Sequence, residues 1–176
     1  ITERDSLPVM TTLGVTTLIS DSGVTRYRVN TEEWMMYDRK KPSYWAFEKG
    51  VYMEQFDSIF NVEASIKADT AYYYDKERLW KLIGNVDIQN RKGERFNTEL
   101  LYWNEATQKV YSDKFIRIQQ PDRIITGHGF DSNQQMTIYT IRNIEGIFYV
   151  DEEASSGPPQ PETKALPDSV NKDTAK

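Results

Sequence analysis

The fragments ADTAYYYD (68–75), NTELLYWN (97–104) and TGHGFDSN (126–133) recur through the stretch that begins at Asn61 and reaches Phe130. Their spacing of about thirty residues is typical of a repeat architecture. A short polar turn and an apolar segment follow each of the first two fragments, and each segment ends in Ile-Gln, at 88–89 and at 118–119. The sequence therefore predicts a strand-and-turn unit that is used repeatedly.

Strict alternation of apolar and polar residues marks the strands of this stretch. Residues 62–67 show it most clearly, and the pattern returns at 86–88, 116–118 and 136–141. Because successive side chains of a strand point to opposite faces, each segment has one buried and one solvated face. The residues expected to face the interior are Val62, Ala64, Ile66, Val86, Ile88, Ile116, Ile118 and Ile138.

The flanking segments continue the β pattern. Residues 11–20 and 24–38 are extended in character and are separated by Asp21-Ser22-Gly23, a sequence that favours a turn and predicts a hairpin. A last short strand is expected at 147–150. At the usual spacing of strands and turns, residues 11–150 would hold about fourteen strands and almost no helix. The pattern predicts an all-β, antiparallel, elongated sandwich or jelly roll.

Composition excludes several classes of function. The chain has 176 residues, 38% of them hydrophobic, which suits one domain with its own core. It has no cysteine, so disulfides, thiolate metal sites and thiol nucleophiles are excluded. A net charge of −5 argues against nucleic acid as a partner. No apolar run reaches the length of about eighteen residues that a membrane span requires.

Catalytic motifs are not evident in the sequence. His128 is the single histidine and lies between two glycines, so a zinc site would need carboxylates that the sequence does not place. Adjacent acids such as Glu32-Glu33 point to opposite faces of a strand and cannot act on one bond. No phosphate loop or nucleophile elbow is present. We expect neither catalytic residues, nor a metal, nor a cofactor.

A family resemblance extends over nearly all of residues 11–150. It rests on TLISDSGVTRYRV (17–29), GVYMEQFD (50–57), GERFNTELLYW (93–103), YSDKF (111–115) and GHGF (127–130), with Glu33-Trp34 and Gly84-Asn85-Val86 between them. In order and spacing these segments resemble the LptC family of lipopolysaccharide-export components in its Bacteroides-type form.

The resemblance implies a twisted β-jelly roll that is incompletely closed and leaves its edge strands free. Its expected ligand is lipopolysaccharide, with the acyl chains held inside by the interior residues named above. The expected partners are the inner-membrane Lpt permease and ATPase complex and the periplasmic bridge protein LptA or its equivalent. The residues expected at the partner-facing edges are Leu13, Val15, Leu18, Ile138, Ile141, Ile147 and Tyr149. A periplasmic location is implied, with an N-terminal anchor outside this chain.

The sequence predicts three segments. It also leaves alternative interpretations of the function and of two short motifs. Residues 1–10 are expected to be a loose lead-in, 11–150 the β domain, and 151–176 a disordered tail rich in proline and charge. The alternative function is an extracellular or cell-surface β-sandwich that binds glycans or proteins through exposed Tyr72, Tyr74, Tyr102 and Trp103. Gly127 and Gly129 either shape a bulge or keep a groove open. Residues 39–42 form either a phosphate contact or a solvated basic turn.

Overall fold

One antiparallel sheet of eleven strands makes up the molecule, as the computed structural model shows for residues 3–150. A short 3-10 helix, η1 (Glu3–Ser6), precedes it, and residues 3–150 contain no α-helix. The strands are β1 (Met10–Asp21), β2 (Val24–Tyr37), β3 (Tyr44–Phe47), β4 (Val51–Phe56), β5 (Val62–Ala68), β6 (Thr70–Tyr74), β7 (Leu79–Asn90), β8 (Arg95–Asn104), β9 (Lys109–Gln119), β10 (Arg123–Asn133) and β11 (Tyr139–Tyr149).

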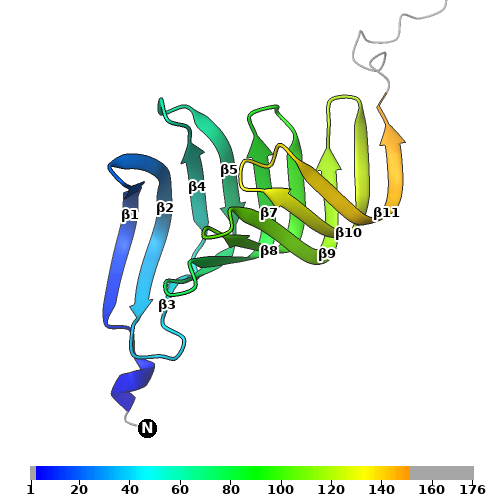
Figure 1. Ribbon diagram of the computed structural model, residues 1–176. Helices are drawn as coiled ribbons and strands as arrows, with labels where there is room; N and C mark the ends of the chain where they lie inside the picture. Colours follow the sequence, from blue (N-terminus) through cyan, green and yellow to red (C-terminus); the bar gives the residue numbers. More distant parts are fainter. Residues whose placement is uncertain (1–2, 151–176) are drawn as a thin grey trace, which may run out of the picture.

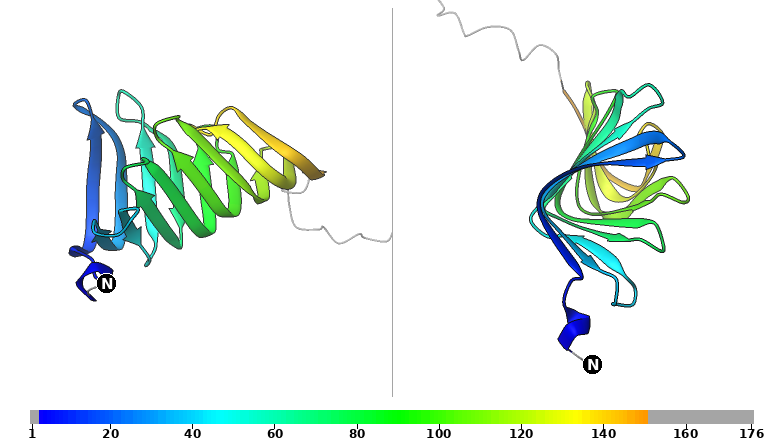
Figure 2. Two further views of the ribbon diagram at one scale, coloured as in Figure 1. Left: turned by 60° about the horizontal axis from the view of Figure 1, so that its bottom comes forward. Right: turned by 90° about the vertical axis from the view of Figure 1, so that its left-hand side faces the viewer.

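The sheet folds over on itself into two walls, as the view from the β1 end shows (Figure 2). Wall A contains β4 and β5, and wall B contains β3 and β6. The longer strands belong to both walls. The first half of β2 pairs with β4 and its end pairs with β3, while the first half of β7 pairs with β6 and its end pairs with β5. β8 to β11 continue both walls in chain order (Figure 1).

The strands bend along one line, which we call the fold line. Bulges interrupt the pairing of β7 with β8 between Ile83 and Val86, and that of β10 with β9 between His128 and Phe130. Gly84 and Asn85 both have positive φ, at 81° and 46°, which glycine and asparagine adopt most readily. Bulges increase the bend and twist of a strand, so their alignment turns one sheet into two walls. The hairpin turns gather opposite the fold line, on what we call the open side.

The thirty-residue unit corresponds to a pair of bent strands. The three fragments found in the sequence occupy the wall B parts of β6, β8 and β10, each just before a hairpin turn. Each turn contains a residue with positive φ, namely Arg78 at 52°, Gln108 at 56° and Met136 at 59°. The side chains of Asn104 and Asn133 accept hydrogen bonds from backbone N–H groups within their turns. The repeat is therefore structural as well as sequential.

The all-β, incompletely closed antiparallel fold is confirmed, but the expected number of fourteen strands is wrong. Bends such as the one at Gly84 divide a strand without ending it, so the strands are fewer and longer. The expected strand at 136–141 is wrong in its first half, since residues 134–138 form the turn before β11, and 139–141 are the start of that strand. Residues 147–149 are the end of β11, which is eleven residues long. The predicted tail at 151–176 lies outside the described residues. No helix in residues 3–150 is long and apolar enough to cross a membrane.

Candidate functional site

A continuous row of apolar side chains crosses the inner face of wall A. Direct cross-strand pairing links each member to the next, from β2 through β4, β5, β7, β8, β9 and β10 to β11. The members, in spatial order, are Val29, Met53, Ile66, Ile88, Phe96, Ile118, Ile125 and Ile147. We call this set the apolar row. Its middle is buried, and its last member, Ile147, is 43% exposed at the edge of the sheet.

The facing row on wall B is aromatic in its first half. Trp45, Tyr73, Trp80 and Trp103 are consecutive cross-strand partners on β3, β6, β7 and β8. Side chains of the two walls contact one another between the rows. The rings of Phe96 on wall A and Phe130 on wall B lie 5.7 Å apart between centroids, and those of Tyr27 on wall A and Trp103 on wall B lie 5.4 Å apart. The middle of the interior is therefore filled by side chains in this closed form.

A cleft of about 700 Å³ opens between the walls on the open side, toward the β1 end. Wall A contributes Ile19, Tyr27 and Phe56 to its lining, and wall B contributes Trp45, Tyr73 and Trp103. Polar and charged side chains surround these apolar residues, so the cleft has an apolar base and a polar, solvated rim. That combination fits an amphiphile better than a purely polar solute.

One carboxylate joins the two walls at this cleft. Glu105, in the turn after β8 on wall B, accepts a hydrogen bond of 2.6 Å from the Tyr27 hydroxyl on wall A. The Trp80 indole donates to the same carboxylate at 2.8 Å and the Tyr73 hydroxyl at 3.4 Å. Arg78 lies 3.7 Å from it, and the Glu105 side chain is only 11% exposed. A carboxylate with so little exposure is stable only when donors satisfy it. We call Glu105 and the side chains that contact its carboxylate the Glu105 bridge.

A second bridge crosses the open side near β11. Glu94, in the turn after β7 on wall A, accepts a hydrogen bond of 2.6 Å from the Tyr139 hydroxyl on wall B. Asn90 donates both to Glu94, at 2.9 Å, and to the Met136 carbonyl across the opening, at 2.8 Å. Gln120 donates to the Tyr139 hydroxyl at 2.5 Å. We call this set the Glu94 bridge.

Tyrosines of both bridges are held in the neutral form. Burial, with the nearby Glu105 carboxylate, raises the pKa of Tyr27 well above its ordinary value and that of Tyr73 to about 12. Burial and the hydrogen bond to Glu94 raise the pKa of Tyr139 to about 12. The phenols therefore act as hydrogen-bond donors throughout the physiological pH range.

Most residues predicted to face the interior are buried there. Ala64, Ile66, Val86, Ile88, Ile116 and Ile118 are between 0% and 8% exposed. Val62 and Ile138 are 45% and 76% exposed, so their predicted interior positions are wrong. Val62 begins β5 beyond a bulge in its pairing with β4, and Ile138 lies in the turn before β11. Whether the six buried residues contact a lipid stays a prediction.

Two edge strands, β1 and β11, each have one strand partner among the described residues. On β1, Leu13 and Leu18 are exposed and Val15 is half-buried; on β11, Ile147 and Tyr149 are exposed and Ile141 is half-buried. Ile138 is not an edge-strand residue, which corrects its second predicted role. The Val150 N–H donates to the Asp122 carbonyl, so alternation turns the N–H groups of Tyr149 and Ile147 away from β10. Among residues 3–150, the edge of β11 thus has backbone donors without a strand partner, beside exposed apolar side chains.

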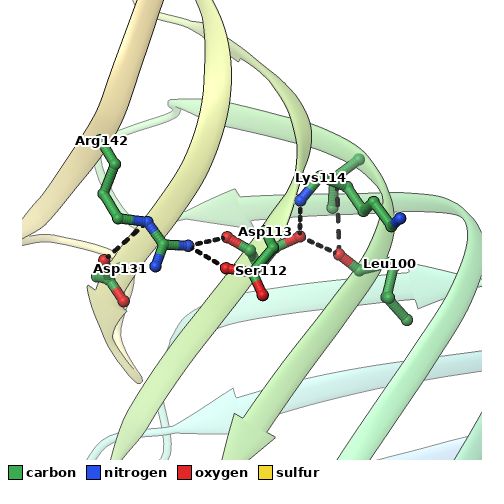
Figure 3. Close-up of polar contacts among 7 residues, drawn as sticks. Leu100, Ser112, Asp113, Lys114, Asp131 and Arg142 are labelled. Atoms are coloured by element: carbon green, nitrogen blue, oxygen red, sulfur yellow. Dashed lines mark hydrogen bonds and ion pairs between the residues drawn. The ribbon is translucent and has the colours of Figure 1, made fainter.

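Arg142 fastens this edge strand to the sheet (Figure 3). Its guanidinium donates to the Ser112 carbonyl on β9 and to the Asp113 carboxylate, both at 2.6 Å, and lies 3.6 Å from Asp131 on β10. The side chain passes over Gly129, where an added Cβ would lie 2.6 Å from the Arg142 Nε. Gly129 therefore leaves room for this arginine. At Gly127 an added Cβ would meet the Ile141 side chain at 2.6 Å, so neither glycine keeps a groove open.

Comparison with known families assigns the chain to one of them. The family described as lipopolysaccharide-assembly, LptC-related matches residues 12–148, which is most of the chain and all but the ends of the sheet. The chain belongs to the LptC family. Comparison with curated proteins found no match. LptC proteins are periplasmic, non-enzymatic components of lipopolysaccharide transport, and their partners are lipopolysaccharide and the Lpt complex.

The four aromatic residues of the alternative function do not share one face of the sheet. Trp103 is 4% exposed and faces the interior, so its predicted surface position is wrong. Tyr72, Tyr74 and Tyr102 are half-buried on the outer face of wall B. The Tyr102 ring stacks on Tyr111 with centroids 5.4 Å apart, which turns their faces toward each other. In this LptC domain the tyrosines stabilise cross-strand pairs.

Sequence reasoning missed much of the interior of this LptC domain. Val29, Met53, Phe96 and Ile125 belong to the apolar row, and alternation at 26–29 was a usable signal for the first of them. No sequence pattern indicates that Glu105 is buried, because it lies in a polar turn, and such turns are predicted to be exposed to solvent. His128 is exposed and pairs with Glu145, and residues 3–150 contain no cluster of metal-ligating side chains.

Proposed function

We propose that this protein holds the acyl chains of lipopolysaccharide between its two walls and passes them from the β1 end to the β11 end. The observation that carries the proposal is the apolar row, which is unbroken from Val29 to Ile147 and reaches the surface at the edge strand. A row that served only as a core would have no need to continue to an exposed edge. A passage that continues into a neighbouring molecule needs this arrangement.

Hydrocarbon burial supplies the affinity in this proposal. Each methylene removed from water contributes about 0.8 kcal/mol, so several acyl chains give a large favourable term without any charged contact. The walls contact each other in the closed form, so the open side has to part before the chains can enter. The fold line keeps the walls connected during that movement, because the long strands run through both.

The two edge strands are the proposed joints with partners. An edge strand with unpaired backbone groups can extend its sheet into another protein. We assign the β1 edge, with exposed Leu13 and Leu18, to the inner-membrane permease and ATPase complex. An N-terminal membrane anchor would hold this edge near that complex. We assign the β11 edge, with Ile147 and Tyr149, to the periplasmic bridge protein LptA or its equivalent.

Photo-crosslinking tests the interior site. A diazirine amino acid at Ile66, which is 8% exposed and faces inward, is compared with the same amino acid at its exposed neighbour Lys67. With purified lipopolysaccharide we expect adducts from position 66 and none from position 67. Ile118 provides a second inward position. Equal labelling at both faces, or none at either in a folded protein, would contradict the proposal.

Proline substitution tests the β11 joint. Tyr149→Pro removes an N–H group that points away from β10, so the domain should stay folded while binding of the bridge protein is lost. Phe148→Pro is the matched variant, since alternation turns its N–H group toward β10, and it should lower the unfolding temperature. Bridge binding is measured by interferometry with immobilised partner. Unchanged binding by the folded Tyr149→Pro variant would exclude this edge.

A further inference from the structure

The two bridges close the open side at opposite ends of the passage. The Glu105 bridge joins β2 to the turn after β8, near the β1 end, and the Glu94 bridge joins the turn after β7 to β11. In each, a tyrosine of one wall donates to a buried carboxylate of the other wall. Acyl chains offer no hydrogen bonds, so a lipid entering from the open side has to break such a bridge without replacing it.

The bridges differ in how readily they can open. Glu105 lines the cleft of about 700 Å³, so water can reach its carboxylate as soon as the Tyr27 hydroxyl leaves. Glu94 is 7% exposed, and four side-chain hydrogen bonds cross the opening there, from Tyr139 to Glu94, from Gln120 to Tyr139, from Asn90 to Met136 and from Lys92 to Thr137. Separating buried polar groups without water costs more than separating hydrated ones. The Glu105 bridge should therefore open first.

We propose that Glu105 and Glu94 are gating residues, with Glu105 controlling lipid entry and Glu94 controlling lipid exit. The proposal rests on the proposed function, because it assumes that acyl chains occupy the interior. Tyr139 belongs to β11, the strand whose free edge faces the next protein. Displacement of β11 by a docked partner would pull Tyr139 from Glu94, which couples release to the presence of an acceptor. Because the Glu105 bridge opens more readily than the Glu94 bridge, lipid enters near the β1 end and leaves at the β11 end.

Single hydroxyl deletions separate entry from exit. Tyr27→Phe keeps the ring that packs on Trp103 but removes the bond to Glu105, and Tyr139→Phe does the same at Glu94 while keeping its contact with Phe96. We expect Tyr27→Phe to load lipopolysaccharide from detergent micelles about tenfold faster, since a hydrogen bond to a charged group is removed. Tyr139→Phe should release the bound lipid to added micelles about tenfold faster, with unchanged loading. Tyr52→Phe, on the exposed face of β4, should change neither rate.

A reversible lock tests the gate by holding the two walls together. The chain has no cysteine, so Tyr27→Cys with Glu105→Cys gives one thiol on each wall for a methanethiosulfonate crosslinker. Loading, read as adducts at position 66, should stop when the lock is closed and return after reduction. Normal loading by the locked protein, or equal rates for wild type and Tyr27→Phe, would overturn the gate even though the interior site stands. If the unlocked wild type gives no interior adduct, the proposed function itself fails.

Discussion

At the residue scale, the apolar row is expected to determine stability as well as lipid contact. Ile88→Ala removes three carbons from a side chain with 0% exposure and leaves a cavity, so the free energy of unfolding should fall by about 2–5 kcal/mol. Gln89→Ala, the next residue and on the outer face, should change it by less than about 0.5 kcal/mol. Urea unfolding followed by tryptophan fluorescence measures both. Similar losses for the two variants would contradict the inward assignment.

The Tyr139 phenol makes stability depend on alkaline pH. Its pKa is raised from 10.0 to about 12, so the folded state favours the protonated phenol. The stabilisation is complete below pH 10, where the unfolded phenol is also protonated, and it is lost as pH rises toward 12. Tyr139→Phe should therefore have lower stability than wild type at pH 8, with a difference that shrinks between pH 10 and 12. Chemical denaturation at a series of pH values tests this, and a constant difference would contradict it.

At the element scale, the fold line depends on residues that tolerate positive φ. Gly84→Ala should cost at least about 1–2 kcal/mol, because φ is +81° and the new Cβ would lie 2.9 Å from the Asp69 carboxylate. Gly93→Ala is the matched control, with φ +77° and no atom within 4 Å of the new Cβ. The difference between the two unfolding free energies isolates the Asp69 contact. A larger loss at Gly93 would show that the fold line is not sterically demanding.

The edge strand β11 should loosen when its arginine is removed. Arg142→Ala deletes the bonds to Ser112 and Asp113, and amide hydrogen exchange within β11 should become faster while β7 stays protected. Arg117→Ala provides a comparison on wall A, where the guanidinium makes only a 3.5 Å contact with Gln119 on its own strand. Mass spectrometry of deuterated peptides gives the rates. Unchanged exchange in β11 would mean that strand pairing alone holds the edge.

Strand faces could be predicted from the sequence to a large extent, and so could the hairpin of β1 with β2, but the register between the other strands could not. Alternation placed Ile66, Ile88 and Ile118 correctly, because a strand's two faces depend only on local order. These three residues form one row only because their strands pair in a particular register. That register depends on contacts between residues far apart in the sequence. Apolar and polar residues continue to alternate through the turn at 134–138, in which Met136 has positive φ. This pattern wrongly predicted that Ile138 faces the interior. Glu105 was missed because its donors come from β2, β6 and β7, far away in the sequence.

At the scale of the whole molecule, loading should separate the walls on one side only. Spin labels at Ser58 and Thr107, in turns of opposite walls beside the cleft, should move apart when lipopolysaccharide binds. Labels at Ser58 and Lys92, both in turns of wall A, should keep their distance. Because the chain contains no cysteine, each pair is introduced without background labelling, and pulsed electron paramagnetic resonance gives the distances. Constant distances for both pairs in the loaded protein would mean that lipid binds without opening.

The meander also sets the reach of the conduit. In the folded sheet each bent strand bonds only to its neighbours in the chain, with β3 and β4 forming one bent strand and β5 and β6 another. Adjacent strands lie about 4.8 Å apart, so each thirty-residue unit of two strands adds about 10 Å of length. Duplication or loss of one unit would lengthen or shorten the span without new packing at the ends. The length of the proposed passage can therefore evolve in steps of about 10 Å, by copying of a gene segment.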